Sequence, residues 1–366
     1  MSESVTRLLG LGLTPGKLRG LNRISNNNGT FTMLALDQNN SMIKMAREAL
    51  QKSGNEREPT YDEIVEAKLE LTREMCGHAS AVLLDAVYGS WNAVASHSLP
   101  ADKGLLVRVE KSGAQTNSKG GIQGEVEPGW SVAQIKKMGA DAVKLLAQYE
   151  PSEPQSAEHQ FALAQKVSAA CKEHDILFLL EPTSYPLEGE TKESDSYLNR
   201  KAQTVIDSAH HLSRLCDVYK AEFPGTLDHE SDEKLQENLN SLNKASLAPW
   251  VLLSAGVDYP QYQKQVAMAV TAGASGVLGG RAFWKEYFLQ DTLPLRRDFA
   301  AGEASERLSE VNDMVQQKAK PWYGHYGLDH NDLKRLRAAE GWFHHYGARE
   351  PMASNRQDQK DLTGDY

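Results

Sequence analysis

A lysine within a short apolar run has the clearest potential for covalent chemistry in this chain. Lys220 lies in the segment Asp217–Phe223, which is rich in residues that favour strands. Burying a lysine costs free energy unless its ammonium group is paired or deprotonated. At the end of a barrel strand, a neutral lysine could attack a carbonyl carbon and form a Schiff base. A structural lysine paired with a carboxylate is the alternative, and the neighbouring strand ends bear on the choice.

Polar residues also end or follow the other apolar runs of the chain. They are Asp37 and Gln38, Asp85, Glu110, Lys144, Glu181, Ser254 with Gly256, and Gly280 with Arg281. Because the carboxyl ends of barrel strands meet at one mouth, we expect these side chains to lie together.

The two lysines of this set suggest an activated amine. Two ammonium groups that lie close together cannot both stay charged cheaply, so either Lys144 or Lys220 should be neutral. Asp37 and Glu181 would offset the remaining charge, and Glu181 could transfer protons. A salt-bridge network that only holds the barrel together is the alternative, but buried ion pairs stabilise poorly.

The last two apolar runs end in segments that suit a phosphate group. Ser254-Ala255-Gly256 and Gly279-Gly280-Arg281 follow runs seven and eight, where such barrels commonly bind phosphate. Glycines let backbone N–H groups approach an anion, and an arginine can donate two hydrogen bonds to it.

Metal ligands are not expected at these strand ends. None of the eleven histidines directly ends an apolar run, and the three cysteines lack metal-type spacing. We therefore predict neither a metal nor another cofactor. The widely spaced cysteines are typical of a cytoplasmic protein with reduced thiols.

The elements that would position these residues alternate between strands and helices. Helix-length segments such as Thr60–Cys76, Ala157–His174 and Tyr197–Cys216 separate the apolar runs, a pattern that predicts an α/β protein with a (β/α)8 TIM barrel. An open doubly wound sheet is the alternative, but no Gly-x-Gly-x-x-Gly follows the first run. The eight runs are Phe31–Leu36, Ala81–Leu84, Gly104–Val109, Ala142–Leu146, Ile176–Leu180, Asp217–Ala221, Trp250–Leu253 and Gly276–Leu278.

Segments outside the barrel are expected at both ends of the chain. The predicted division is an N-terminal extension over 1–30, the barrel over 31–300 and a helical, aromatic extension over 301–366. The last part contains two related aromatic clusters, Trp322–Gly327 and Trp342–Gly347. They could form a lid or interface near the substrate, or pack on the barrel as anchors.

The net charge of −9 gives no support for nucleic acid or an anionic membrane as a partner. No segment is long and apolar enough to span a membrane, and no signal peptide is recognisable. A cytoplasmic protein with a small-molecule substrate is expected, and a homo-oligomer is compatible with the sequence.

The strand-end segments resemble those of the class I tagatose-1,6-bisphosphate aldolases in the DeoC/LacD aldolase superfamily. The matching stretches are Ala35–Gln38, Leu83–Asp85 with Tyr88-Gly89, Glu110–Gly113, Gly139–Lys144, Leu180-Glu181, Asp217–Pro224, Leu253–Val257 and Gly276–Trp284. They occur in the family's order over about residues 30–290.

This resemblance implies Lys220 as the Schiff-base lysine and Glu181 as the acid–base residue. It implies that Lys144 and Asp37 orient the substrate and tune Lys220. Implied contacts to the phosphate of a dihydroxyacetone-phosphate half come from Ser254, Gly256, Gly280 and Arg281.

The implied reaction is reversible cleavage of a phosphorylated ketohexose. A sulfofructose-phosphate aldolase or another sugar-phosphate aldolase with the same lysine chemistry is one alternative. A non-catalytic sugar-phosphate sensor on an aldolase scaffold is another. Asn39-Asn40 departs from the family, which usually has an arginine and then a small or acidic residue after Asp-Gln.

Overall fold

Eight parallel strands close into a barrel, as the alternation of apolar runs and helices predicts. The computed structural model describes residues 12–337, 341–344 and 346. Each strand pairs with the next along the chain, and the last pairs with the first. The barrel strands are β1 (Phe31–Ala35), β2 (Ala81–Leu84), β3 (Gly104–Arg108), β6 (Ala142–Gln148), β7 (Leu177–Thr183), β8 (Val218–Ala221), β9 (Trp250–Leu253) and β10 (Gly276–Gly279).

Side chains of the strands alternate between two apolar cores. Leu177 and Leu179 of β7 belong to the core inside the barrel, whereas Phe178 and Leu180 pack against the surrounding helices. Because successive side chains point to opposite faces, this alternation directs the next residue, Glu181, into the barrel. By the same argument, Lys144 points into the barrel because it lies two positions after the inward-facing Ala142, and Lys220 does so because it lies two positions after Val218.

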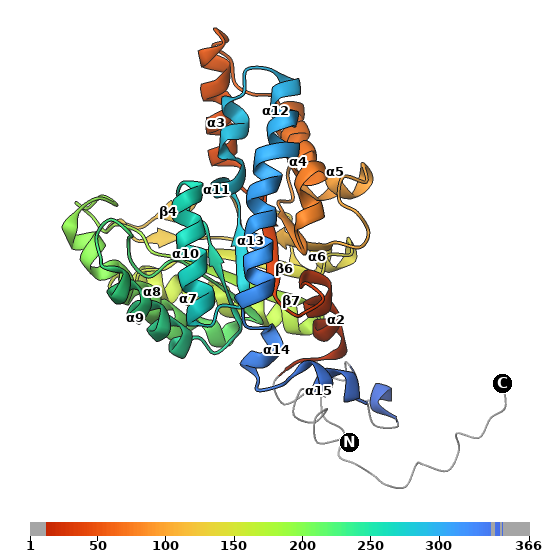
Figure 1. Cartoon of the computed structure of the whole chain (residues 1–366). Coiled ribbons are helices and arrows are strands. Elements are labelled where there is room, and N and C mark those ends of the chain that lie inside the picture. The colour runs from red at the N-terminus through yellow and green to blue at the C-terminus, as the bar shows by residue number, and fades with distance from the viewer. Residues whose placement is uncertain (1–11, 338–340, 345, 347–366) are drawn as a thin grey trace, which may run out of the picture.

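Helices surround the barrel (Figure 1). Thr60 caps α4 instead of belonging to it, because its side chain accepts a hydrogen bond from Glu63 N. The helix α7 begins earlier than expected, at Pro154, where a proline is well tolerated. The helices are α3 (Asn40–Lys52), α4 (Tyr61–Met75), α5 (Ser90–Ala95), α6 (Val132–Lys137), α7 (Pro154–Glu173), α8 (Asp195–Leu212), α9 (Asp232–Ala245), α10 (Tyr259–Ala272), α11 (Arg281–Trp284), α12 (Leu293–Phe299) and α13 (Ser305–Lys318).

The first aromatic cluster closes the amino-terminal end of the barrel. Trp322 is 1% exposed and packs in the inner core with Phe31. Its backbone N–H donates a hydrogen bond to Gly29 O, just before β1. Short helices α2 (Pro15–Ile24), α14 (Trp322–His325) and α15 (His330–Arg335) gather there (Figure 1). The interpretation of this cluster as a lid near the substrate is therefore wrong. The cluster lies at the amino-terminal end of the barrel, and the candidate site residues lie at the carboxyl-terminal end.

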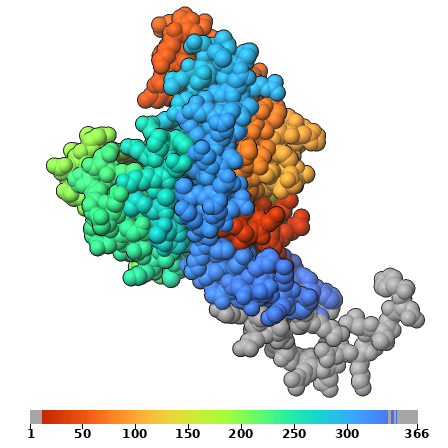
Figure 2. Space-filling view, in the orientation of Figure 1, coloured from red at the N-terminus to blue at the C-terminus, as the bar shows by residue number. Residues whose placement is uncertain are grey.

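The second aromatic cluster is described only in part. Trp342 and Phe343 belong to a short 3-10 helix and are exposed, whereas residues 345 and 347 lie outside the described part of the chain. The helix α13 runs along the barrel and packs on α10 and β1 (Figures 1 and 2). The division of the chain at residues 30 and 300 into an N-terminal extension, the barrel and a C-terminal extension stays a prediction. None of the described helices is long and apolar enough to cross a membrane.

Candidate active site

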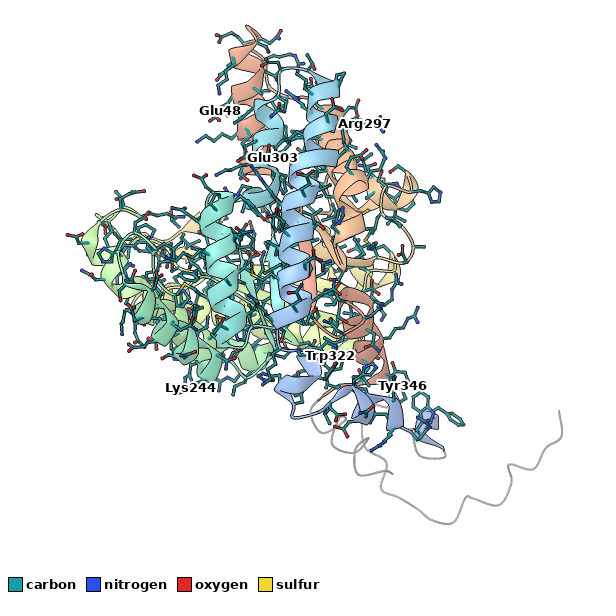
Figure 3. All side chains as sticks on the ribbon, in the orientation of Figure 1. Glu48, Lys244, Arg297, Glu303, Trp322 and Tyr346 are labelled. Carbon is teal, nitrogen blue, oxygen red and sulfur yellow. The ribbon has the colours of Figure 1, made fainter. Side chains whose placement is uncertain are left out.

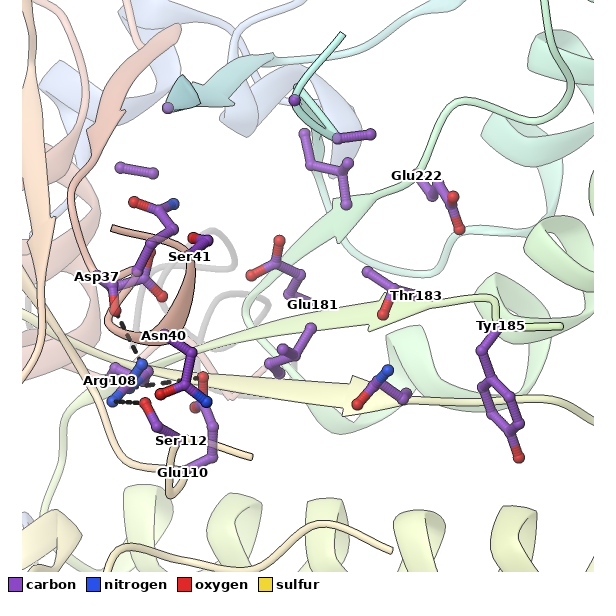
Figure 4. Close-up of a pocket in the computed structure, with 18 of the residues that line it drawn as sticks. Asp37, Asn40, Ser41, Arg108, Glu110, Ser112, Glu181, Thr183, Tyr185 and Glu222 are labelled. Carbon is purple, nitrogen blue, oxygen red and sulfur yellow. Dashed lines mark hydrogen bonds and ion pairs between the residues drawn. The ribbon is translucent and has the colours of Figure 1, made fainter. Parts of the chain in front are cut away.

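A cavity of about 660 Å³ lies at the carboxyl ends of the barrel strands. Figure 4 shows Asp37, Glu110 and Glu181 around this space, and Arg108 and Ser112 beside them. The short hairpin of β4 (Gln115–Thr116) and β5 (Ile122–Gln123) contributes to its wall. Ten of the eleven predicted site residues line it, namely Asp37, Gln38, Glu110, Lys144, Glu181, Lys220, Ser254, Gly256, Gly280 and Arg281.

Lys144 is held by three carboxylates. Its Nζ lies 2.8 Å from Asp37 Oδ2, 2.8 Å from Glu110 Oε1 and 3.0 Å from Glu181 Oε2. The three partners come from the ends of different strands, so the ammonium group ties several strand ends together. All four side chains are buried.

Glu181 joins the two lysines of the site. Its Oε1 lies 2.7 Å from Lys220 Nζ, while Oε2 faces Lys144. Among the described residues, Glu181 is the one carboxylate that forms an ion pair with Lys220. The structure thus brings together the predicted nucleophile, acid–base residue and auxiliary lysine.

The electrostatics determine the charge of Lys144. Burial lowers the pKa of Lys144, but the charges of Asp37, Glu110 and Glu181 outweigh burial and raise that pKa well above its ordinary value. Lys144 is therefore an ammonium group at neutral pH. The sequence predicted one neutral lysine without saying which. The three carboxylates exclude Lys144, and a neutral Lys220 stays a prediction.

The pKa values of two carboxylates around Lys144 are shifted in opposite directions. Burial raises the pKa of Asp37, but Lys144, Lys220 and Arg108 together bring it well below its ordinary value. For Glu110, burial is the larger effect and its pKa is raised despite Lys144. Glu110 Oε2 and Gln38 Oε1 are buried without a hydrogen-bond partner among the described residues. Both atoms are almost without exposed surface, so they are unsatisfied acceptors of cavity-lining side chains and not open contacts for a ligand.

The predicted phosphate loops meet at another part of the cavity. Gly280 N donates to Ser254 Oγ over 3.2 Å, so this N–H is already used within the protein. Gly256 has a φ of +79°, and a Cβ there would lie 3.0 Å from the Arg281 guanidinium carbon. Arg281 donates to Ala255 O at 3.5 Å and has no carboxylate partner among the described residues. Its guanidinium group can therefore bind an anion.

The prediction that Asp85 contacts the substrate is wrong. Asp85 is fully buried, does not line the cavity and forms an ion pair with Lys68. The chain turns after β2, and Asp85 Oδ1 accepts hydrogen bonds from Val87 N and Tyr88 N at 2.8 Å. The side chain is used in this turn, so it does not reach the mouth.

Several cavity residues were missed from the sequence, among them the cations Arg108 and Lys192. Arg108 donates to Asp37 O at 2.8 Å and to Ser112 Oγ at 2.9 Å. A charge inside the apolar run Gly104–Val109 was the available signal. Lys192 lines the cavity from the loop before α8 and has no ion pair among the described residues. Loop lysines of this kind are not distinguishable by sequence.

No group of three or more histidine, cysteine, aspartate or glutamate side chains is arranged to hold a metal within the described residues. The prediction of no metal or other cofactor stays a prediction.

Comparisons with known proteins identify one family. A family model described as DeoC/LacD family aldolase matches residues 31–286. The chain is 30% identical over 335 residues to a protein from Listeria innocua named tagatose 1,6-diphosphate aldolase, covering 86% of this chain and 96% of that protein. It is also 30% identical over 332 residues to tagatose 1,6-diphosphate aldolase 2 of Enterococcus faecalis, covering 86% of this chain and 97% of that one.

Solved structures share the fold. A Plasmodium falciparum fructose-bisphosphate aldolase, solved with TRAP and an inhibitor, has a TM-score of 0.64 at 11% identity, covering 87% of this chain and 97% of that one. A structure titled as a Schiff-base-forming fructose-1,6-bisphosphate aldolase has a TM-score of 0.53 at 15% identity, covering 82% of this chain and 99% of that one. At these identities the likeness shows the barrel fold.

Proposed function

The chain belongs to the DeoC/LacD family of aldolases, and we propose that it cleaves a phosphorylated ketohexose such as tagatose 1,6-bisphosphate by class I chemistry. The products are dihydroxyacetone phosphate and an aldehyde. The observation that carries this proposal is the single carboxylate of Glu181 between Lys220 and the fixed ammonium group of Lys144.

Lys220 is the nucleophile of the proposed reaction. A protonated amine has no lone pair to offer, and Lys144 is kept protonated by its three carboxylates. In contrast, Lys220 forms an ion pair with one carboxylate among the described residues, that of Glu181. After loss of a proton to Glu181, the Lys220 nitrogen attacks C2 of the ketose and forms a carbinolamine. Glu181 returns this proton to the carbinolamine hydroxyl, which leaves as water, and the iminium ion forms.

The iminium ion accepts the electron pair released when the C3–C4 bond breaks. Glu181, directly or through a water, removes the proton of the C4 hydroxyl, whose oxygen becomes the aldehyde oxygen. The enamine is then protonated at C3, and water hydrolyses the resulting iminium ion. This step restores Lys220 and releases dihydroxyacetone phosphate, so that atoms and charge balance over the cycle.

The remaining cavity residues suit the parts of a sugar phosphate. Arg281 and the Ser254–Gly256 loop would hold the phosphate next to C1, and Gly280 lines the same part of the cavity. The side chains of Gln38 and Glu110 line the cavity and would bind sugar hydroxyls after a rotation that exposes their unpaired acceptors.

The distal phosphate requires a different group from the family's usual arginine. Asn39 is buried and its side chain accepts a hydrogen bond from Lys68. Lys192 lies in the cavity wall and is the cation we assign to the distal end. A sulfonate in place of this phosphate would bind by the same chemistry, so a sulfofructose-phosphate substrate stays an alternative.

Turnover tests the proposal and its alternatives. Purified protein is incubated with tagatose 1,6-bisphosphate, fructose 1,6-bisphosphate, sulfofructose 1-phosphate and the sugar 1-phosphates, and dihydroxyacetone phosphate is measured. The proposal expects release from at least one bisphosphate. Binding of these sugars without release would support the sensor alternative and refute the aldolase.

We also propose the cytoplasm as the compartment and no nucleic acid partner, and a homo-oligomer is compatible with the sequence. The three cysteines, Cys76, Cys171 and Cys216, are free thiols, as expected in a reducing compartment. Size measurement by light scattering tests the assembly.

A further inference from the structure

Lys68 is a completely buried lysine on α4, outside the cavity and next to the end of β1. Its Nζ donates to Leu36 O at 2.8 Å, to Asn39 Oδ1 at 3.0 Å and to the carboxylate of Asp85. An ammonium group has three hydrogens, so these partners use its full donor capacity.

The partners of Lys68 enclose two residues of the active site. Leu36 immediately precedes Asp37-Gln38, and Asn39 immediately follows them. The ammonium group therefore fixes this dipeptide at both of its ends. Asp37 in turn binds Lys144 over 2.8 Å, and the side chain of Gln38 lines the cavity.

Other side chains hold the same strand end at different atoms. Arg108 donates to Asp37 O at 2.8 Å, and Trp284 Nε1 donates to Ala35 O at 3.1 Å. Neither donates a hydrogen bond to Leu36 O or Asn39 in the described part of the chain. The connection from Lys68 is thus separate from these two, and it runs to Asp37, one of the three carboxylates that keep Lys144 charged.

Stability alone is a poor explanation for this lysine. Taking two charges out of water costs about as much as their attraction returns, so apolar side chains of similar size often stabilise as well as a buried pair. An apolar side chain could fill the space but could not donate three directed hydrogen bonds. The specific contribution of the ammonium group is the geometry of residues 36–39.

We propose that Lys68, together with Asp85 and Asn39, is a positioning residue that holds Asp37 and Gln38 in their reactive arrangement. This inference rests on the proposed aldolase function. It gives Asp85 a role that differs from the substrate contact expected from the sequence.

The test separates loss of positioning from loss of stability. Lys68→Met leaves the buried Asp85 carboxylate without its cation, so Lys68→Met/Asp85→Asn is made as well to remove that charge. The double variant should regain most of the melting temperature that the single change loses. Its kcat should still fall by about 10- to 100-fold, because small misplacement of reacting groups has effects of this size.

Lys17 supplies a matched control at the opposite end of the barrel. It is 6% exposed and pairs with Asp217, with Nζ at 2.8 Å and 3.0 Å from the two carboxylate oxygens. Lys17→Met/Asp217→Asn removes the same kind of ion pair without touching the strand end at Asp37. This control should keep kcat within about twofold, the range expected of changes outside the site.

Two further readouts distinguish positioning from a general loosening of the barrel. The inhibition constant of inorganic phosphate, bound by the loops at Ser254 and Gly280, should stay unchanged in the Lys68 double variant. The alkaline limb of kcat should move to lower pH. Asp37, Glu110 and Glu181 together oppose the effect of burial and raise the pKa of Lys144, so a displaced Asp37 allows Lys144 to lose its proton earlier.

Asn39→Leu tests one connection without exposing a buried charge. Loss of one hydrogen bond should lower kcat by about threefold to tenfold, and the ion pair of Lys68 with Asp85 should remain. A double variant and an Asn39→Leu protein that both keep the unchanged enzyme's kcat and pH profile would overturn the proposal. An unchanged chain that cleaves no ketose would instead refute the aldolase function itself.

Discussion

Replacing Lys144 by methionine should destabilise the protein in a way that depends on pH. The change removes the cation that three buried carboxylates share, with Nζ–O distances of 2.8 to 3.0 Å. Breaking a buried ion pair by removing one partner costs about 3–5 kcal/mol. Since Asp37, Glu110 and Glu181 all lose this partner, we expect the free energy of unfolding at pH 7 to fall by at least about 3 kcal/mol.

The sign of the pH dependence follows from the shifted groups. The folded-state pKa of Asp37 is lowered, so its contribution to stability is present above about pH 4, the unfolded value, and is lost as pH falls through the folded pKa. The folded-state pKa of Lys144 is raised, so its contribution is complete below the unfolded value of about 10.4 and is lost only at higher pH. The unchanged protein therefore keeps the whole contribution at neutral pH.

In the Lys144→Met protein the carboxylates repel one another and take up protons more readily. The difference in unfolding free energy from the unchanged protein should therefore shrink as the pH falls from 7 to 5. Urea unfolding followed by tryptophan fluorescence at both pH values measures it. Lys244→Met, on the exposed surface of α9 (Figure 3), is the control and should change stability by less than about 0.5 kcal/mol. The assigned charge network would be refuted if the Lys144→Met protein and the unchanged protein had the same unfolding free energy. It would also be refuted if the difference between them were equal at pH 7 and pH 5.

Three other outcomes are expected. Arg281→Ala should weaken binding of dihydroxyacetone phosphate by about 2–3 kcal/mol in calorimetry, as for a charge-assisted hydrogen bond, and an unchanged affinity would move the phosphate site elsewhere. Treatment with EDTA should leave the initial rate of cleavage unchanged, and a loss that zinc restores would contradict the class I mechanism. Removing the distal phosphate should lower kcat/KM by less than about tenfold, or ~1.4 kcal/mol, because Lys192 is the one loop cation that we assign to it; a thousandfold loss would require further cations.

The barrel strands could be predicted almost residue by residue because of their burial. Parallel strands covered on both faces give continuous apolar runs, and Ala81–Leu84 and Trp250–Leu253 coincide with β2 and β9. The hairpin of β4 and β5 was not predicted, since strands of two residues have no periodicity to detect. The helix ends differ where a capping residue lies just outside, as Thr60 does.

The site was predictable where strand alternation decides the direction of a side chain. Lys144, Glu181 and Lys220 each lie two positions after an inward-facing residue of the same strand, so they enter the cavity. Asp85 follows the end of its strand, and a local turn with the buried Lys68 determines its direction instead. The sequence does not show that Lys68, 17 residues earlier, lies beside it.

The location of the first aromatic cluster depends on how the chain continues after the barrel. Trp322 reaches the amino-terminal end because α13 runs along the outside of the barrel and returns the chain to Gly29. The composition of this cluster alone is compatible with a location at either end of the barrel.

Borohydride trapping with dihydroxyacetone phosphate tests the central claim most directly. Reduction fixes the imine as a stable secondary amine, and mass analysis of the peptides identifies the modified lysine. We predict one adduct, on Lys220, and none in Lys220→Ala, which should also lose nearly all turnover. An adduct on Lys144, or trapping that persists in Lys220→Ala, would contradict the assignment of the nucleophile.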